Sequence, residues 1–125
     1  MVLRKVEITD YPTLASWWRA RDWSVPSYDM LPATGMIVDG VAAGFLYRTD
    51  SKICWLEFVI SNPESDKSDR SQALNLIIDD LLSQAKESGF KSVFTSLEHP
   101  GLIQRYEDFG FLITDTKMSN MIKRL

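Results

Sequence analysis

The first part of the chain changes from a strand pattern to a helix pattern. Residues 2–8 alternate between apolar and more polar side chains, which is the period of a strand with one buried face. The segment Thr9 to Pro12 then offers a capping residue followed by a proline suited to a first helical turn. The side chains that recur at spacings of three and four are Leu14, Trp17, Trp18 and Arg21. The pattern predicts a strand and then a helix that ends before Ser24, followed by a loop or broken helix over 24–34.

The middle of the chain carries a clear hairpin signal. The dipeptide Asp39-Gly40 separates the apolar runs 35–38 and 41–47, and Asp-Gly tolerates the positive φ angles of a tight two-residue turn. After another turn, residues 53–60 form an apolar run that only Glu57 interrupts. Such a run predicts a central strand that is covered on both faces.

The second half of the chain contains the longest helical pattern. Its apolar positions share the spacing of one helix face: Leu74, Ile77, Ile78, Leu81, Leu82 and Ala85. Residues 91–97 read as a strand and residues 100–109 as a short helix that Gly110 ends. Residues 111–115 and 120–125 suggest a closing hairpin. The predicted order is β, α, β, β, β, α, β, α, β, β.

The strand–loop–helix–strand order of residues 53–97 predicts a right-handed crossover between two parallel strands. The charged loop between the first strand and its helix then lies at the carboxyl end of that strand, beside a helix N-terminus. Open α/β sheets bind ligands at such places, so an anion is expected there.

Composition narrows the functional classes. The 125 residues are 45% hydrophobic, enough for a single domain over 1–125. The lone Cys54 sits in an apolar run, which indicates a buried thiol and leaves neither a disulfide nor a cysteine metal site. The net charge of −3 argues against nucleic acid as a partner. With no signal-peptide or membrane-span pattern, we expect a cytoplasmic protein whose partner is a small molecule or a protein.

Two segments resemble the GNAT acyltransferases. Residues Tyr106 to Phe111 match the Tyr-x-x-x-Gly-Phe that ends the family's last helix, and residues 60–74 align without gaps to its strand, pyrophosphate loop and helix. The likeness extends from Val2 to Leu125. It implies a mixed, mostly antiparallel sheet of six to seven strands flanked by three to four helices. It also implies transfer of an acetyl or similar acyl group from coenzyme A to a primary amine, and relatives that are often dimers.

The coenzyme loop departs from the family pattern. Where the family has Gln or Arg, then Gly, then Gly or Ala, this chain has Asp66, Asp69 and Ser71. Asp69 is expected to cap its own helix, with Gln72 completing a capping-box-like pair, and the charges of the loop sum to −1. The coenzyme-binding residues implied by the alignment and position are Val59, Ile60, Lys67, Ser68, Asp69, Arg70, Ser71, Gln72 and His99. The alternative is a GNAT-fold protein that has lost catalysis and serves as a binding or structural module.

Two residues are candidates for proton transfer. Glu57 is the charged residue of an apolar strand, where burial raises a carboxyl pKa toward that of a useful base. Its alternative is a structural role, either in an ion pair with a neighbouring strand or facing solvent at a sheet edge. Tyr106 is the candidate acid for the leaving thiolate, as the resemblance implies; its alternative is a core aromatic. His99 is either a base or, beside Pro100, a helix cap.

An aromatic cluster precedes the predicted hairpin. Its members are Trp17, Trp18, Trp23 and Tyr28, in the part of the chain that shapes the acceptor pocket in GNAT proteins. Two adjacent tryptophans on one helix are expected to divide, one toward the core and one toward a ligand or a subunit contact. No metal site is predicted.

Overall fold

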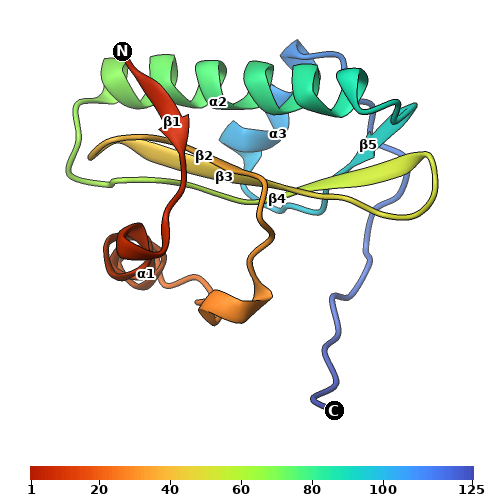
Figure 1. Ribbon diagram of the computed structural model, residues 1–125, viewed down its shortest axis with the longest axis horizontal. Coiled ribbons are helices and arrows are strands. Elements are labelled where there is room, and N and C mark those ends of the chain that lie inside the picture. Colours follow the sequence, from red (N-terminus) through yellow and green to blue (C-terminus); the bar gives the residue numbers. More distant parts are fainter.

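The computed structural model describes all 125 residues and is built on one five-stranded sheet (Figure 1). In sheet order its strands are β1 (Leu3–Lys5), β2 (Gly35–Val38), β3 (Ala42–Tyr47), β4 (Ile53–Ser61) and β5 (Ser92–Phe94). All neighbours are antiparallel except β4 and β5, which are parallel as the crossover pattern predicts.

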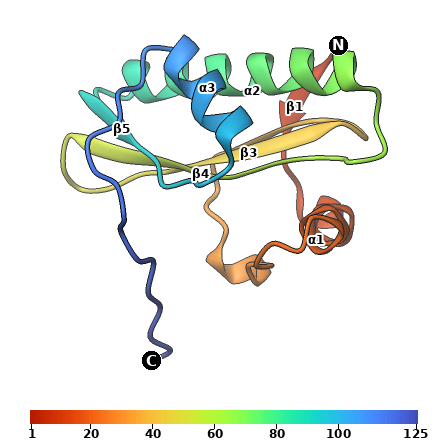
Figure 2. The same cartoon turned by 180° about the vertical axis from the view of Figure 1, so that it is seen from behind.

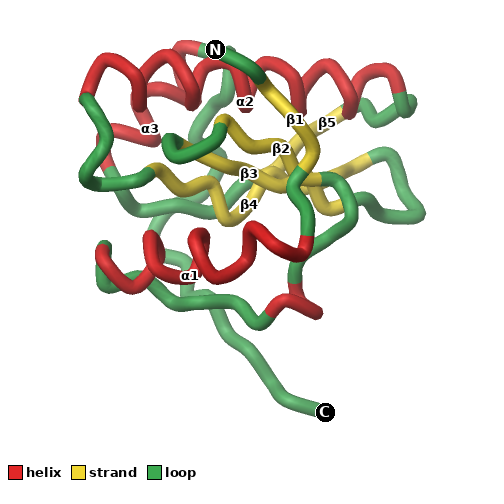
Figure 3. Tube along the Cα trace, turned by 60° about the vertical axis from the view of Figure 1, so that its left-hand side comes forward, coloured by secondary structure: helices red, strands yellow, loops and turns green.

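The helices cover both faces of this sheet. They are α1 (Tyr11–Ala20), α2 (Lys67–Glu87) and α3 (Pro100–Asp108), with single 3-10 turns η1 (Ile8–Asp10) and η2 (Tyr28–Met30). Helix α1 lies on one face, and α2 and α3 lie together on the other (Figure 3). No helix combines the length and the apolar character that a membrane crossing requires.

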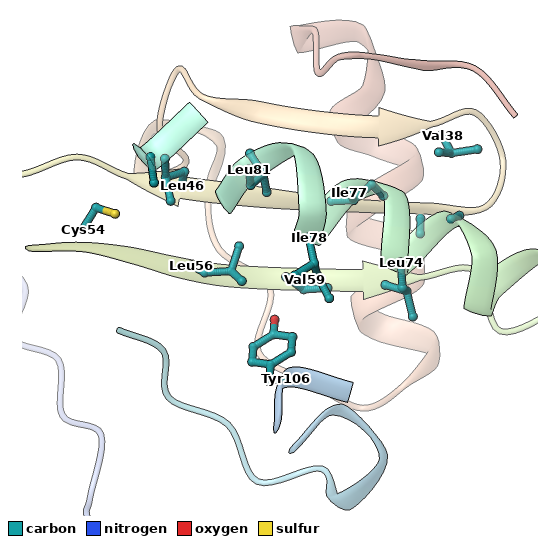
Figure 4. Packing of buried hydrophobic residues seen from close by; sticks show 13 residues of the cluster. Val38, Leu46, Cys54, Leu56, Val59, Leu74, Ile77, Ile78, Leu81 and Tyr106 are labelled. Atoms are coloured by element: carbon teal, nitrogen blue, oxygen red, sulfur yellow. The ribbon is translucent and has the colours of Figure 1, made fainter. Parts of the chain in front are cut away.

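Each face of the sheet has its own core. On the α2 side, Leu56, Ile78 and Leu81 are fully buried in a cluster of 13 residues (Figure 4). On the α1 side, a second cluster of 7 buried residues includes both Trp17 and Trp18, which are 5% and 1% exposed. The expectation that one of these tryptophans faces outward is therefore wrong. Both rings are buried because they pack in one cluster with Ile37, Phe45 and Ile60 of the sheet.

The hairpin between β2 and β3 is present, but its turn has three residues. Val38 pairs with Ala42, so Asp39, Gly40 and Val41 lie between the strands, in place of the predicted two. Gly40 has a φ of +72°, which is the conformation that glycine adopts most easily.

The closing hairpin is not formed. Residues 112–125 are exposed and contain no strand, and the chain runs past β5 and away from the body (Figures 1 and 2). The sheet therefore has five strands, below the expected six to seven, and β5 is one of its edges.

Candidate active site

A bulge in β4 shapes the site. Phe45 pairs with Glu57 and Ala43 with Ile60, so two residues of β4 lie opposite Gly44 alone, and the alternation of side chains shifts by one position. Phe58 takes up the shift with a φ of +53°, an unusual conformation for a residue with a large side chain.

Glycine at position 44 allows this bulge to pack. A Cβ there would lie 3.0 Å from Ile77 Cγ2 and 3.1 Å from Val59 Cγ2. Both contacts are tighter than ordinary van der Waals packing. The absence of a side chain at Gly44 therefore lets α2 and the bulged strand approach the same point from two sides.

Beyond Trp55 the parallel strands β4 and β5 part. Their pairing covers three residues and ends at Trp55 with Phe94. The next contacts use side chains, because Thr95 Oγ1 donates to the Leu56 carbonyl at 2.6 Å and the Ser96 amide donates to Glu57 Oε1 at 2.8 Å. The two strands thus open into a gap whose inner end is held by a hydroxyl and a carboxylate.

Glu57 is a half-buried carboxyl group at this gap. Burial raises its pKa from 4.5 to about 7, and the hydrogen bond from the Ser96 amide opposes part of that shift. No cation pairs with it, since the ion pairs of the molecule both involve Arg4. The structural ion pair considered as the alternative role of Glu57 is therefore absent.

Tyr106 reaches the same gap from α3. Its ring is buried in the α2-side core, and its hydroxyl points toward β4 (Figure 4). Burial raises the pKa of Tyr106, the negative charge of Glu57 raises it further, and Thr95 and Arg105 partly oppose this. Burial therefore gives the gap one carboxyl group with a pKa of about 7 and one phenol that stays protonated at neutral pH.

A cavity of about 360 Å³ lies where the gap opens at the carboxyl end of β4. Its walls come from β4, the N-terminal turns of α2 and α3, and the residues that follow α1. Four cations line it, and no carboxylate does: Arg21, Lys67, Arg70 and Arg105. None of these four is in an ion pair, so the cavity presents uncompensated positive charge.

The first turn of α2 adds backbone donors to this cavity. Asp66 is the N-cap residue, and its Oδ1 accepts a long hydrogen bond of 3.4 Å from the Ser68 amide. Asp69 lies in the first turn, is exposed and caps nothing, so the prediction that Asp69 caps the helix is wrong. Because the helix begins at Lys67, three residues earlier than that prediction requires, the capping role falls to Asp66.

The cavity contains six of the nine predicted coenzyme-binding residues: Val59, Ile60, Lys67, Arg70, Ser71 and His99. Ser68 and Asp69 are exposed outside it. Gln72 faces a larger, open groove of about 710 Å³ between α2 and α3. His99 caps α3, with Nδ1 accepting from the Leu102 amide at 3.3 Å, so the capping alternative is confirmed for this residue.

Sequence reasoning missed two cations of the cavity. Arg21 follows α1 and Arg105 precedes Tyr106 on α3. Arg21 continues the helical spacing of the buried α1 residues, so its place on the inner face of that helix was visible. Its position beside the carboxyl end of β4 depends on how α1 crosses the sheet, which the spacing does not specify.

The aromatic residues predicted for the acceptor pocket separate into two groups. Trp17 and Trp18 are core residues, so their burial leaves no surface for an acceptor. Trp23 lines the cavity and lies against the His99 ring at 6.3 Å between centroids. Tyr28 is 43% exposed and packs edge-on against Tyr11.

Comparison with known proteins identifies the fold. No protein-family model matches the sequence, and no curated protein matches it either. Solved structures do match. A putative acetyltransferase from Agrobacterium tumefaciens superposes with a TM-score of 0.74 at 14% identity, covering 98% of this chain and 100% of its own. Rv2747 from Mycobacterium tuberculosis, solved in complex with CoA, gives 0.72 at 16% identity and coverages of 95% and 76%.

A third match carries the family name. A GNAT-family acetyltransferase from Streptococcus pneumoniae superposes with a TM-score of 0.68 at 17% identity, covering 99% of this chain and 97% of its own. At identities this low, the matches show that the fold is shared, whereas the reaction has to be argued from the residues of the site. The three matches together show that the chain has the fold of the GNAT acetyltransferases.

Proposed function

We propose that the protein is an N-acyltransferase that moves an acetyl or similar acyl group from coenzyme A to a primary amine of a small molecule or protein. One observation carries the proposal. The gap between β4 and β5 has Glu57 and Tyr106 at its inner end, and the cavity at the carboxyl end of β4 is lined by four cations and no carboxylate. A proton acceptor, a proton donor and an anion site are the three requirements of this reaction.

The cavity fits the phosphates of the coenzyme. Arg70 and Lys67 lie in the first turn of α2, where helix amides and the helix dipole also favour negative charge. Hydrogen bonds of that turn within the protein involve only the amides of Ser68 and Arg70, which leaves those of Lys67 and Asp69 as donors. The coenzyme would supply an activated acyl thioester, and the backbone of Val59 and Ile60 would line its path.

The carboxyl and phenol groups then divide the proton transfers. Glu57 Oε1 is held by the Ser96 amide, so Oε2 is the oxygen that takes a proton from the acceptor amine. Tyr106 remains protonated at neutral pH because burial raises its pKa, so its hydroxyl can donate to a leaving thiolate. These roles predict that kcat/KM rises as the pH increases through about 7, where Glu57 ionises.

Two measurements test the proposal. Calorimetric titration with acetyl-CoA should show binding, and the absence of heat at millimolar coenzyme would refute the proposed acyltransferase function. Measuring the coenzyme A thiol released from acetyl-CoA in the presence of amino sugars, amino acids and peptides then identifies the acceptor. Glu57→Gln and Tyr106→Phe should each lower turnover by about 100-fold or more, whereas the matched exposed change Glu64→Gln should leave it unchanged.

A catalytically silent binding protein is the second candidate. The observation in its favour is the pair Asp69 and Ser71, which stand where the family's loop has small residues. Glycines there let a backbone approach phosphate closely. This candidate predicts weak or absent binding of acetyl-CoA and no thiol release with any amine, and Glu57→Gln would then change neither result.

A further inference from the structure

Arg21 occupies an unusual position at the carboxyl end of β4. It follows α1, yet its guanidinium crosses to the sheet, where Nε donates to the Ser61 carbonyl at 3.0 Å and Nη2 donates to Ser61 Oγ at 2.7 Å. The guanidinium carbon also lies 5.7 Å from the centroid of the Trp23 ring. Two hydrogen bonds and an aromatic face therefore fix this charge at the wall of the cavity.

Arg70 brings a second guanidinium to the same place from α2. Its Nη1 donates to the carbonyls of Ser65 and Pro63, so it is tied to the loop that precedes the helix. Burial lowers the pKa of Arg21, and the charge of Arg70 lowers it further. The two cations thus repel one another across the cavity that both of them line.

Neither arginine has a carboxylate partner. By contrast, Arg4 on β1 forms ion pairs with Asp10 and Asp39. Arg21 and Arg70 direct their hydrogen bonds to protein at neutral oxygens of Ser61, Ser65 and Pro63. A phosphate group would relieve the repulsion between these two guanidinium groups. The planar N–H donors of a guanidinium also match the geometry of phosphate oxygens.

We infer that Arg21 is a phosphate ligand that acts together with Arg70, so that part of the phosphate site comes from α1. The inference rests on the proposed function in taking the coenzyme's phosphates as the occupant. The side chains of these two arginines supply contacts that do not require the backbone freedom of glycine, which the chain lacks at Asp69 and Ser71. Phosphate binding would then also stabilise the Arg21–Trp23 segment against Ser61 and His99.

Calorimetry on the full chain with inorganic pyrophosphate and with CoA tests this inference without reference to turnover. Arg21→Gln should weaken both ligands by about 10-fold or more. Arg21→Lys keeps the charge but loses the fork and should give an intermediate value. Arg19→Gln, which removes the same charge from an exposed position of the same helix, should leave both affinities unchanged.

Unfolding by heat separates binding from structure. Arg21→Gln also removes the hydrogen bonds to Ser61, so its stability without ligand is compared with that of Ser61→Ala, which removes one of them. A ligand site predicts that pyrophosphate raises the melting temperature of Ser61→Ala and much less that of Arg21→Gln. Equal increases in the two variants would overturn the inference.

The outcomes also separate this inference from the proposed function. If CoA binds and Arg21→Gln binds it as tightly as the parent protein, the role of Arg21 is wrong and the acyltransferase proposal stands. If pyrophosphate binds through Arg21 but CoA does not, the phosphate site is supported and the coenzyme assignment fails. Binding of neither ligand would contradict both.

Discussion

The two edges of β4 differ in how they are held. On one edge β3 pairs with it from Ala42 with Ser61 to Tyr47 with Trp55, interrupted by the bulge. On the other edge β5 pairs with three residues and then separates. The first edge belongs to the antiparallel sheet that α1 and α2 cover, whereas the second opens toward Glu57 and the cation-lined cavity.

This difference shows how one strand serves both stability and binding. The bonded edge and the buried side chains fix the path of β4, so the free edge keeps its shape without a neighbouring strand. The bulge at Phe58 is possible because Gly44 leaves room for it. Preorganised groups lose less free energy on binding than groups that must first be ordered. We therefore expect mutations on the packed side, where β4 meets β3 and the helices, to change stability. Mutations on the open side, where β4 parts from β5, should change affinity.

The largest effect should come from the packed side. Ile78 is fully buried between α2 and the sheet, and Ile78→Ala should lower the free energy of unfolding by about 2–5 kcal/mol through lost burial and a cavity. Leu76→Ala, on the same helix at a position 37% exposed, should cost under about 1 kcal/mol. Urea unfolding measures both, and equal losses would contradict the placement of the core.

The second-largest effect on stability is expected at Gly44, where α2 meets the bulged strand. Gly44→Ala places a methyl group 3.0 Å from Ile77 and 3.1 Å from Val59, and overpacking of this kind costs about 1–3 kcal/mol. Val59→Ala in the same chain should recover part of the loss, because it removes one of the two contacts. Urea unfolding of the double-mutant cycle measures this coupling, and strict additivity would show that the bulge does not depend on Gly44.

A smaller effect is expected at the open edge, and it depends on pH. The pKa of Glu57 rises from 4.5 to about 7 on folding, so the folded protein binds more protons than the unfolded chain between these values. Stability contributed by this group is therefore fully present below about pH 4.5 and is lost as the pH rises through about 7. Glu57→Gln should lack this decline, and Glu64→Gln in the exposed loop should retain it.

Urea unfolding at several pH values between 4 and 8 makes that comparison. A parent protein and a Glu57→Gln variant with parallel pH profiles would mean that the carboxyl group is solvated and that the gap is wider than the structure shows. In that case the pH at which kcat/KM rises would also move down, toward the ordinary range of a glutamate.

The sequence predicted the packed side of β4 better than the open side. The spacing of Leu74, Ile77, Ile78 and Leu81 identified α2, because a helix that buries one face repeats with its own period. The crossover pattern correctly predicted the parallel pairing of β4 and β5, with the loop before α2 at the carboxyl end of β4. The bulge could not be read from residues 53–60, since an apolar run gives no sign of which side chains share a face.

The sequence also could not predict which residues from distant elements come together in the cavity. Lys67 and Arg70 were found because they lie within one loop and helix, whereas Arg21 and Arg105 reach the cavity through tertiary packing. The capping error at Asp69 arose from the helix boundary, since a helix start three residues earlier transfers the capping role to Asp66. The predicted hairpin of residues 111–125 had suitable β-branched residues but no partner strand to order them.

The smallest effect should follow from removing that C-terminal segment. Residues 112–125 are exposed along their whole length, so a chain that ends at Phe111 should lose less than about 0.5 kcal/mol of stability. Phe111 itself packs on Tyr106, with 5.2 Å between ring centroids, and its amide donates to the Tyr106 carbonyl. Phe111→Ala should therefore cost more than the entire deletion. If the deletion proves costlier by urea unfolding, the segment contacts β5 in solution, and the open edge of the sheet is shorter than the structure shows.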